Sequence, residues 1–400
     1  MADTSTDQQR ELVDERLERL FDEHPPGETD DQEFWGAQYD LGLAWVQFPE
    51  GKGGLGVSPR FQKRVNDAIE DAGGSIENRY RNLLGIGMGA GTLIAHATEE
   101  QQDRWLRPMF TMEELWCQLF SEPGAGSDLA GLATSAEREG DEWIVNGQKV
   151  WTTLAHRSKW GMIVTRTDPD VPKHAGLTYF IVDMEADGVS VRPLYQITGE
   201  AEFNEVYFDD VHIPDENRIG EVGAGWSVAM ATLMNERVAI GASVVPRGSG
   251  AIGQAVATWN ERDLDDPVKR DELTRHWIAA EAQRLTAARA SEARQKGTPG
   301  PEGSTAKLQW AELNKAITSF TMDLLGEEGL LYPDGYELVR PDETGTRTPS
   351  RHKAFLRARA NSIEGGTSEI MKNILGERVL GLPGEPRVDK NIPWKEVPRS

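Results

Sequence analysis

The sequence has a single cysteine in 400 residues, and this scarcity excludes two kinds of chemistry. Cys117 cannot form a disulfide within the chain, and a cysteine-based zinc or iron–sulfur site would have no further ligands. We therefore interpret Cys117 as a small buried hydrophobic side chain. Long apolar runs are also missing: no stretch reaches the roughly 18 to 20 residues that span a bilayer, and the N-terminus has no apolar signal-peptide core. We expect a soluble cytoplasmic protein with no membrane insertion.

Basic residues are in the minority, with 43 Lys and Arg against 66 Asp and Glu, which gives a formal charge of −23. Nucleic acids and anionic lipids are bound mainly through Lys and Arg, so neither is expected as a partner. The seven histidines include no pair at the i, i+4 spacing that places two metal ligands on one helix face, so we expect no metal site. Neither a Walker loop nor a GxGxxG after a strand is present. A nucleotide cofactor would need another kind of site.

The chain is long for one hydrophobic core, and its pattern changes twice along the sequence. Residues 1–115 have apolar positions at helical spacing, which predicts an N-terminal helical domain. Residues 116–224 contain short alternating runs such as "LTYFIVDM" between Gly, Asp and Pro turns, which predicts a β domain. Residues 225–400 return to helical spacing and end in a Pro-rich tail, which predicts a second helical domain with an extended tail.

Two glycine-containing segments carry the candidate chemistry. In "NSIEGGTSEI" (361–370), adjacent glycines can bring backbone N–H groups close to a ligand, and the flanking Glu364 and Glu369 could act as a base or cap a helix. In "FSEPGAGSDLAGLATSAE" (120–137), the small residues form a loop whose amides can face a planar or anionic ligand. From these residues alone, the structural helix-capping role is the preferred reading of residues 361–370, and the ligand-binding role of residues 120–137 stays open.

The order of a helical domain, "SEPGAGSD", "GQKVWTT" and a helical domain ending in "GGTSEI" resembles the acyl-CoA dehydrogenase family along the whole chain. The resemblance implies an α+β multidomain fold: an N-terminal α-helical domain, a central β domain and a C-terminal α-helical bundle. It also implies FAD as cofactor and an acyl-CoA thioester as substrate. The implied reaction is α,β-dehydrogenation to a trans-2-enoyl-CoA, with electrons passed to an electron-transferring flavoprotein.

The resemblance also assigns flavin contacts. An indole offers a rigid face to the flavin ring, and a hydroxyl can bond the ring edge, in agreement with the family roles of Trp151 and Thr153. A tryptophan in a strand is otherwise usually a core residue, which is the alternative for Trp151. Thr367 and Glu369 match positions near the flavin diphosphate, but either could be a helix cap. The other implied flavin contacts are Gln118, Phe120, Ser121, Gly126 and Ser127.

Many family members carry the catalytic glutamate directly before "GTS", where this chain has Gly365. A second branch places the base in a helical Glu-Arg pair, and "LMNERVAIG" supplies Glu236 and Arg237. Glu236 shares a helix face with apolar residues, which raises the proton affinity of a carboxylate toward the range of a general base. The resemblance therefore implies Glu236 as the base, with Glu364 in reserve. The alternative is a buried Glu236 that pairs with an arginine only to join two helices.

The glycine loop keeps a catalytic role in this reading, because the family uses the backbone N–H at Gly365 to polarise the thioester carbonyl. Such a donor stabilises negative charge that develops on the oxygen. The substrate-binding residues implied by the resemblance are Ser127, Arg237 and Gly365.

Two family motifs that reach the FAD of a neighbouring subunit are altered. In place of Arg-x-x-Phe-Gly the chain has Arg262 followed by Asp265 and Asp266, and a second motif carries Asp323 for glutamine and Glu327 for glycine. Added carboxylates repel a pyrophosphate. This pattern resembles subunits of actinobacterial mixed tetramers that act on sterol side chains. We expect an oligomer that could include a related second subunit.

Two alternatives to a complete acyl-CoA dehydrogenase stay open. One is a non-catalytic or half-site subunit of a mixed acyl-CoA dehydrogenase complex. The other is a flavin monooxygenase of the same fold, which generally lacks the base.

Overall fold

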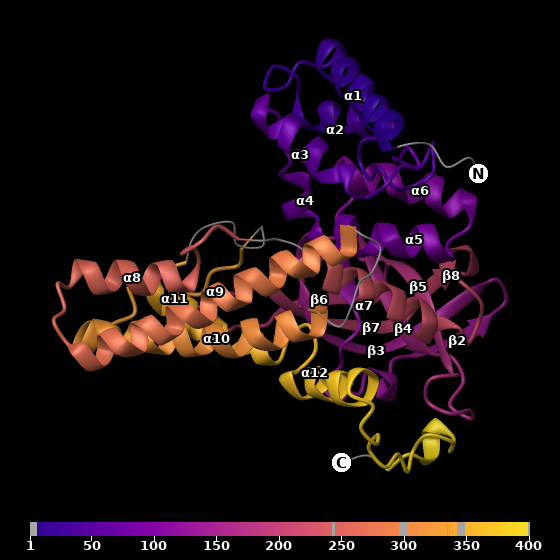
Figure 1. The fold of residues 1–400 in the computed structure, drawn as a ribbon. Helices are drawn as coiled ribbons and strands as arrows, with labels where there is room; N and C mark the ends of the chain where they lie inside the picture. The colour runs from indigo at the N-terminus through magenta and orange to yellow at the C-terminus, as the bar shows by residue number, and fades with distance from the viewer. Residues whose placement is uncertain are drawn as a thin grey trace.

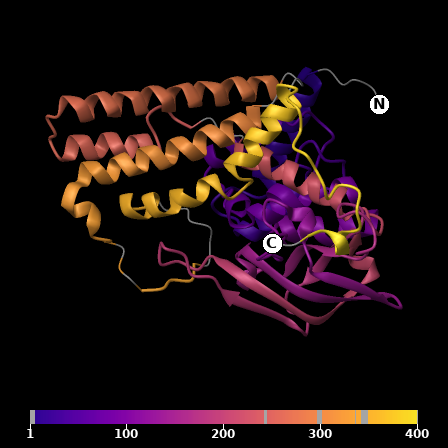
Figure 2. The ribbon, with the colours of Figure 1, turned by 90° about the horizontal axis from the view of Figure 1, so that it is seen from below.

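The computed structural model describes residues 6–241, 245–295, 302–333, 335, 337–341 and 349–398, with side chains for all of these except 236–241, 294, 295, 302 and 303. Helices come first, a β-sheet follows and helices return (Figure 1). This order confirms the predicted α+β multidomain fold. The N-terminal helices stand on one face of the sheet, whereas the C-terminal bundle projects to one side of it (Figures 1 and 2).

The N-terminal helices form because their apolar residues recur every three or four positions and their ends are capped. In the first helix, Val13, Leu17 and Leu20 lie on one buried face. The last helix begins with a capping box in which Thr98 and Gln101 bond each other's backbone N–H groups. The elements are α1 (Thr6–Glu23), α2 (Asp31–Asp40), α3 (Phe61–Asp71), α4 (Asn78–Arg81), the π-helical turn η1 (Gly85–Gly89), α5 (Ala90–His96) and α6 (Glu99–Phe110).

The described residues form one eight-stranded sheet with the order β6-β7-β3-β2-β4-β5-β8, and β1 lies beside β4. Neighbouring strands are antiparallel except β1 with β4 and β2 with β4. The strands are β1 (Trp116–Leu119), β2 (Ser135–Glu139), β3 (Glu142–Thr153), β4 (Trp160–Arg166), β5 (Leu177–Asp183), β6 (Val189–Pro193), β7 (Phe203–Pro214) and β8 (Arg218–Ile219). Short helical turns between them are η2 (Leu129–Gly131), η3 (Ala155–Arg157) and η4 (Asp215–Asn217).

The central strands β4 and β5 are buried along almost their whole length because both faces of the sheet are covered there. Alternate side chains of a strand point to opposite faces, so Met162 and Val164 join the core shared with the N-terminal helices. Ile163, between them, joins a second core on the other face. Cys117 lies in this second core, where burial raises the pKa of its thiol to about 12. Its interpretation as a buried hydrophobic residue is confirmed.

The C-terminal part begins with helix α7 (Gly225–Gly241), which lies between the sheet and α5. Tyr179 of β5 and Thr92 of α5 both hydrogen-bond Thr232 of α7, at 3.2 and 2.9 Å. The bundle that follows packs around Ile252, Phe320 and other apolar residues. Its helices are α8 (Ala251–Glu261), α9 (Pro267–Gln295), α10 (Glu302–Leu325), the turn η5 (Gly326–Leu330) and α11 (Arg351–Ala358).

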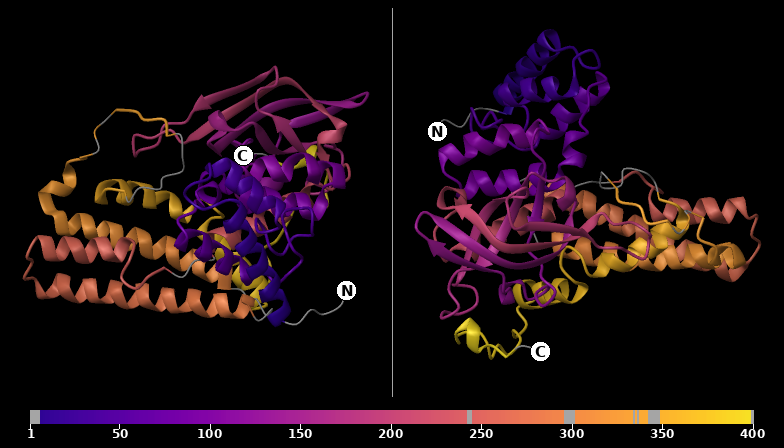
Figure 3. Two further views of the ribbon diagram at one scale, coloured as in Figure 1. Left: turned by 90° about the horizontal axis from the view of Figure 1, so that it is seen from above. Right: turned by 180° about the vertical axis from the view of Figure 1, so that it is seen from behind.

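The last elements bring the chain back to the sheet. They are η6 (Arg359–Ser362), α12 (Ser368–Ile374), the π-helical turn η7 (Leu375–Val379) and η8 (Trp394–Glu396). The tail between η7 and η8 passes under the β domain, opposite the N-terminal helices (Figure 3). Within the described residues, no helix combines the length and apolarity that a membrane span needs.

Candidate functional site

Two of the sequence motifs meet at a buried ion pair. Glu122, in the loop after β1, and Lys149, in β3, place Oε1 and Nζ 2.8 Å apart. The Lys149 Nζ also donates to the carbonyl oxygens of Phe120 at 3.1 Å and Val164 at 2.8 Å. The backbone N–H groups of residues 133–134 donate to the Glu122 carboxylate at 2.7 and 2.9 Å. Every charged group of the pair therefore has partners.

The electrostatics of this pair favour the charged form of Glu122, whereas burial lowers the pKa of Lys149. Burial alone would raise the pKa of Glu122, but the charge and hydrogen bond of Lys149, with the other donors, outweigh burial and lower that pKa. The three acceptors around Lys149 match the three N–H bonds of an ammonium group. A backbone hydrogen bond of 2.9 Å from Val150 N to Ser121 O adds to the connection. The loop that begins at Phe120 is thus fixed against β3, the strand that carries Trp151.

Sequence reasoning missed both members of this pair. The alternation of apolar residues along β3 could nevertheless have indicated that Lys149 is buried. Trp143 and Val145 are buried, and steps of two along β3 place Lys149 on the same inward face. A lysine there requires a buried acceptor. Its partner Glu122 could not be named from this pattern, because pairing depends on how the loop folds back.

Trp151 sits in a strained and exposed position. The pairing of β3 with β7 is irregular between Lys149 and Thr152, and Trp151 has φ +61°, which non-glycine residues rarely adopt. Its side chain is 56% exposed and meets the ring of Phe203 edge-on, with centroids 5.8 Å apart. Neighbouring Thr153 is half-buried. Trp151 is therefore outside the core, with an accessible aromatic face.

The loop from Glu122 to Ser127 is anchored at its base and open at its tip. Glu122 and Ala125 exchange two backbone hydrogen bonds of 3.0 Å, and Ala125 is buried. Gly124, Gly126 and Ser127 are exposed, and a Cβ added at either glycine would meet nothing within 4 Å. The glycine N–H groups are accordingly reachable by a ligand. In contrast, Phe120 is buried against Tyr179, so its side chain faces the core. Of the remaining predicted residues here, Gln118 and Ser121 are half-buried.

The second glycine segment forms a tight turn before α12. Gly365 and Gly366 have φ +60° and +90°, and Gly365 is exposed. A Cβ at Gly366 would lie 2.6 Å from Met371 Cε. The hydroxyl of Thr367 accepts the N–H of Ile370 at 3.1 Å, which makes Thr367 the N-cap of α12. The structure thus gives Thr367 the capping role, and exposed Glu369 lies in the first turn.

Glu364 is held by an arginine that sequence reasoning did not consider. Arg357 donates two hydrogen bonds to the Glu364 carboxylate, at 2.9 and 2.8 Å, and Asn361 donates a third at 2.9 Å. The Arg357 guanidinium also lies 5.8 Å from the centre of the Phe203 ring and 3.8 Å from Glu202 Oε1. Burial raises the pKa of Glu202. No short motif signals this group, because its members come from β7, the loop before β7, α11, η6 and the turn after η6.

These contacts bring together two predicted regions. Trp151 touches Phe203, Phe203 lies next to Arg357, and Arg357 binds Glu364 beside Gly365. Helix α7 carries the backbone of Glu236 and Arg237, but their side chains lie outside the described residues. Upstream of them, Val228 and Ala229 are buried in the core shared by the N-terminal helices and the sheet.

Three family models cover most of the chain: the acyl-CoA dehydrogenase N-terminal domain matches residues 3–113, the middle domain 117–211 and the C-terminal domain 223–380. The chain belongs to the acyl-CoA dehydrogenase family. Members of this family are oligomeric FAD flavoproteins with oxidoreductase activity.

Similar acyl-CoA dehydrogenases occur in mycobacteria. Acyl-CoA dehydrogenase IpdE1 of Mycobacterium tuberculosis is 40% identical over 359 residues, which cover 86% of each chain. Acyl-CoA dehydrogenase FadE34 of the same organism is 38% identical over 346 residues, covering 86% of this chain and 45% of FadE34. Among solved structures, the ChsE4-ChsE5 complex from Mycobacterium tuberculosis matches with TM-score 0.68 and 27% identity over 96% of this chain and 100% of that chain. The Tcur3481-Tcur3483 steroid ACAD has the same fold, with TM-score 0.71, 24% identity and coverage of 96% and 100%.

The residues of this acyl-CoA dehydrogenase fit the ring half of FAD better than its diphosphate half. An exposed aromatic face at Trp151 and an open glycine loop suit a planar ring. At the family's phosphate-contacting positions, Arg262 instead forms a 2.8 Å ion pair with Glu328. Lys269 donates to the backbone carbonyl of Asp323 at 3.3 Å. Both cations are therefore already engaged within the bundle.

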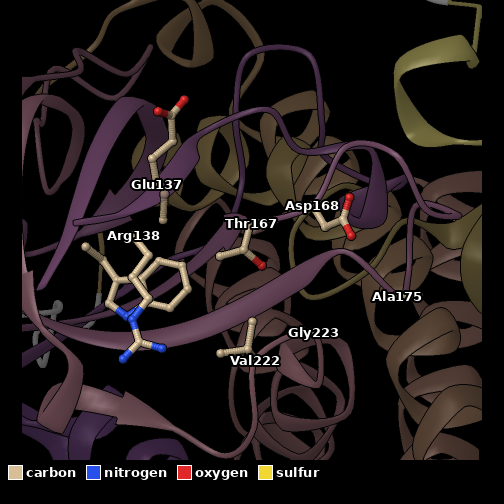
Figure 4. Close-up of a pocket in the computed structure, with 9 residues that line it drawn as sticks. Glu137, Arg138, Thr167, Asp168, Ala175, Val222 and Gly223 are labelled. Atoms are coloured by element: carbon tan, nitrogen blue, oxygen red, sulfur yellow. The ribbon is translucent and has the colours of Figure 1, made fainter. Parts of the chain in front are cut away.

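Two cavities lie away from the predicted flavin contacts. A cavity of about 510 Å³ is bordered by β2, the loop after β4 and the segment before α7; Figure 4 shows Arg138, Thr167, Asp168 and Val222 around it. A second cavity of about 340 Å³ lies between the 196–199 loop, the end of α10 and α11. Within the residues that the structure describes, no three His, Cys, Asp or Glu side chains are placed to hold a metal ion.

Proposed function

We propose that this chain catalyses FAD-dependent α,β-dehydrogenation of an acyl-CoA thioester to a trans-2-enoyl-CoA. The observation that carries the proposal is the contact series from Trp151 through Phe203 and Arg357 to Glu364. It connects an exposed aromatic face of the β domain with the glycine turn of the C-terminal part. A flavin ring against Trp151 would then have the Gly365 N–H nearby for a thioester carbonyl.

We propose the following roles for the residues that the family resemblance assigns. FAD, when bound, supplies the acceptor for hydride from the substrate β-carbon, and an electron-transferring flavoprotein receives the electrons. Glu236 is the proposed acceptor of the α-proton, and Arg237 is a proposed substrate-binding residue. The Gly365 N–H donates to the thioester oxygen, which stabilises the charge that develops as the proton leaves. Ser127, on its exposed loop, contacts the thioester end of the substrate.

Glu236 remains the proposed base rather than Glu364, and the hydrogen bonds of Glu364 support this choice. The oxygens of Glu364 already accept three hydrogen bonds from Arg357 and Asn361, so the carboxylate would have to leave them to approach a substrate. At the family's usual base position, φ +60° at Gly365 disfavours any side chain. The missing side chain also leaves room for a branched or bulky acyl group.

Purified protein with a counted flavin content tests the reaction. Acyl-CoAs that range from short straight chains to steroid side-chain thioesters are mixed with it in the absence of oxygen and of any added electron acceptor, so that reduced flavin accumulates. A separate assay with an artificial dye as electron acceptor then measures turnover. We expect at least one substrate to bleach the flavin absorbance and yield an enoyl-CoA. FAD that stays oxidised with the entire panel would overturn the assignment.

A second candidate is a half-site subunit in a mixed complex, and the bundle supplies the observations that favour it. Arg262 is engaged by Glu328, and Asp265, Asp266 and Glu327 add negative charge where a neighbour's pyrophosphate would lie. The exposed apolar side chains of Ile278 and Leu285, two turns apart on α9, offer a face for another subunit. A related partner with intact phosphate contacts would complete only the sites to which it contributes.

Flavin counting distinguishes the candidates. If the altered phosphate contacts weaken FAD binding, this chain purified alone retains well under one FAD per chain. A mixed complex with a related subunit should then contain about one FAD for every two chains. Glu327→Gly with Glu328→Gln should raise retention by the chain alone, because a carboxylate is removed and Arg262 is released. A homo-oligomer with one FAD per chain would exclude the half-site reading.

A further inference from the structure

The residues after the last family match have a defined place on the β domain. The match ends at residue 380, and the described residues continue to 398 as a tail that returns beneath the sheet (Figure 3). Trp394 N donates to Val171 O at 2.9 Å, and Lys395 N donates to Pro169 O at 3.1 Å. Pro172 and Pro393 form a β-bridge. The tail is thus paired with the loop between β4 and β5.

Trp394 connects the tail to the loop that carries Ser127. Its indole Nε1 donates to the carbonyl oxygen of Gly131 at 3.2 Å. Its ring lies against the guanidinium of Arg166, whose carbon is 4.6 Å from the ring centre. A cation over an indole face is the most favourable of the cation–aromatic contacts.

Arg166 also binds the loop directly. It is only 3% exposed and donates to the carbonyl oxygens of Ala130 at 2.6 Å, Leu132 at 3.3 Å and Lys173 at 2.7 Å. With the indole bond to Gly131, three successive carbonyls of the loop are bound by Arg166 or Trp394. The carbonyls of residues 130–132 therefore cannot shift without breaking buried or partly buried hydrogen bonds.

An ion pair fixes the residue next to Ser127. Lys173 is 8% exposed, and its Nζ contacts both carboxylate oxygens of Asp128, at 2.8 and 2.9 Å, and Oδ2 of Asp389 at 2.5 Å. Asp389 belongs to the tail, and Asp128 directly follows Ser127. The hydrogen bond from Lys173 lowers the pKa of Asp389. Both carboxylates thus balance one nearly buried ammonium group.

We propose that residues 385–398 are an intramolecular strap, and that Trp394 and Asp389 are positioning residues for Ser127. The inference rests on the proposed function for the role of Ser127. The loop tip at Gly124 and Gly126 has no side-chain packing of its own. Its downstream half is fixed by the strap, through Arg166 and Lys173, while its upstream half is fixed by Glu122. The strap acts on the substrate only through the placement of this loop.

Amide hydrogen exchange in the full-length holoprotein, read on peptides that cover residues 123–132, tests the strap directly. Trp394→Ala removes a hydrogen bond and a cation–aromatic contact, so exchange should quicken at least about tenfold. Trp394→Phe keeps a ring over Arg166 and should have a smaller effect. Asp389→Asn, which removes only one charge, gives a second route if Trp394→Ala fails to fold. Lys395→Ala is the matched control, because it breaks an exposed tail ion pair with Asp170 and leaves the loop contacts intact.

Kinetics separate positioning from simple stabilisation. If the strap places Ser127, Trp394→Ala and Asp389→Asn should raise KM for the acyl-CoA severalfold to about tenfold, with a smaller effect on kcat. Lys395→Ala should change neither constant.

Two results would contradict these expectations. Unchanged amide exchange in residues 123–132 of folded Trp394→Ala or Asp389→Asn would overturn the strap. Faster exchange with an unchanged KM would overturn the positioning role. A wild-type protein with no acyl-CoA turnover would refute the proposed function, whereas the exchange measurement would still decide whether the strap exists.

Discussion

Lys149 and Glu122, 27 residues apart in the sequence, form a 2.8 Å ion pair inside the β domain, where Lys149 is fully buried. The pair joins the strand that presents Trp151 to the loop that presents Ser127. Burying two charges is unfavourable unless each has full hydrogen bonding, and both do here. The pair therefore acts as a rigid connection between the two predicted flavin-contacting segments.

Removal of one partner should be strongly destabilising. Glu122→Gln leaves the Lys149 ammonium buried without a counter-charge, and we expect a loss of about 3 to 5 kcal/mol in the free energy of unfolding. Urea titration measures this change. Glu122→Gln with Lys149→Met should recover most of the loss, since the uncharged pair of similar volume has no charge to desolvate and the glutamine oxygen can still accept from the backbone N–H groups of residues 133–134. Asp67→Asn, in an exposed pair with Lys63, is the control and should change stability by less than about 1 kcal/mol.

The same pair makes stability depend on pH. The pKa of Glu122 is lower in the folded protein than in the unfolded chain, where glutamate has a pKa of about 4.3. The stability that its charge contributes is therefore complete above about pH 4.3 and decreases as the pH falls through the lower folded pKa. Urea titrations from pH 7 down to pH 3 should show wild type and Glu122→Gln converging toward acid. A constant difference between them would contradict this linkage.

Replacement of the proposed base should abolish substrate reduction without loss of the cofactor. Glu236→Gln removes the proton acceptor, so flavin reduction by acyl-CoA should slow by at least about 10² to 10⁴. Stopped-flow absorbance at the flavin band gives the rate, and the bound flavin content should match wild type. Glu364→Gln is the comparison variant. Normal turnover by Glu236→Gln with an inactive Glu364→Gln would exchange the two assignments.

Substitution of Trp151 should separate folding from flavin binding. At φ +61° tryptophan is strained, and glycine is not, so Trp151→Gly gains backbone relief of about 1 to 2 kcal/mol. Greater freedom of glycine in the unfolded chain offsets much of this gain. We expect apoprotein stability within about 1 kcal/mol of wild type, but weaker FAD retention and a shifted flavin spectrum. Full FAD occupancy with an unchanged spectrum would show that Trp151 does not contact the ring.

The fold was largely predictable because the spacing of apolar residues along the sequence indicates most of its helices and strands. Val13, Leu17 and Leu20 recur at helical spacing, and the apolar runs of β4 and β5 have the length of buried strands. The site was predictable only in part. The family motifs indicate Trp151 and Gly365, but no periodicity predicts the left-handed backbone at Trp151 or the contact of Arg357 with Glu364.

The sequence by itself determined the helical, β and helical order, the burial of Cys117 and the glycines that permit both loops, because each depends on neighbouring residues or composition. Only the tertiary structure decided which charges pair. Glu122 meets Lys149, Arg357 meets Glu364, and Asp389 reaches Lys173 from 216 residues away. The sequence contains many acidic residues, and any of them could in principle pair with one of these cations. The choice among them is made by the backbone positions that packing of the hydrophobic core imposes.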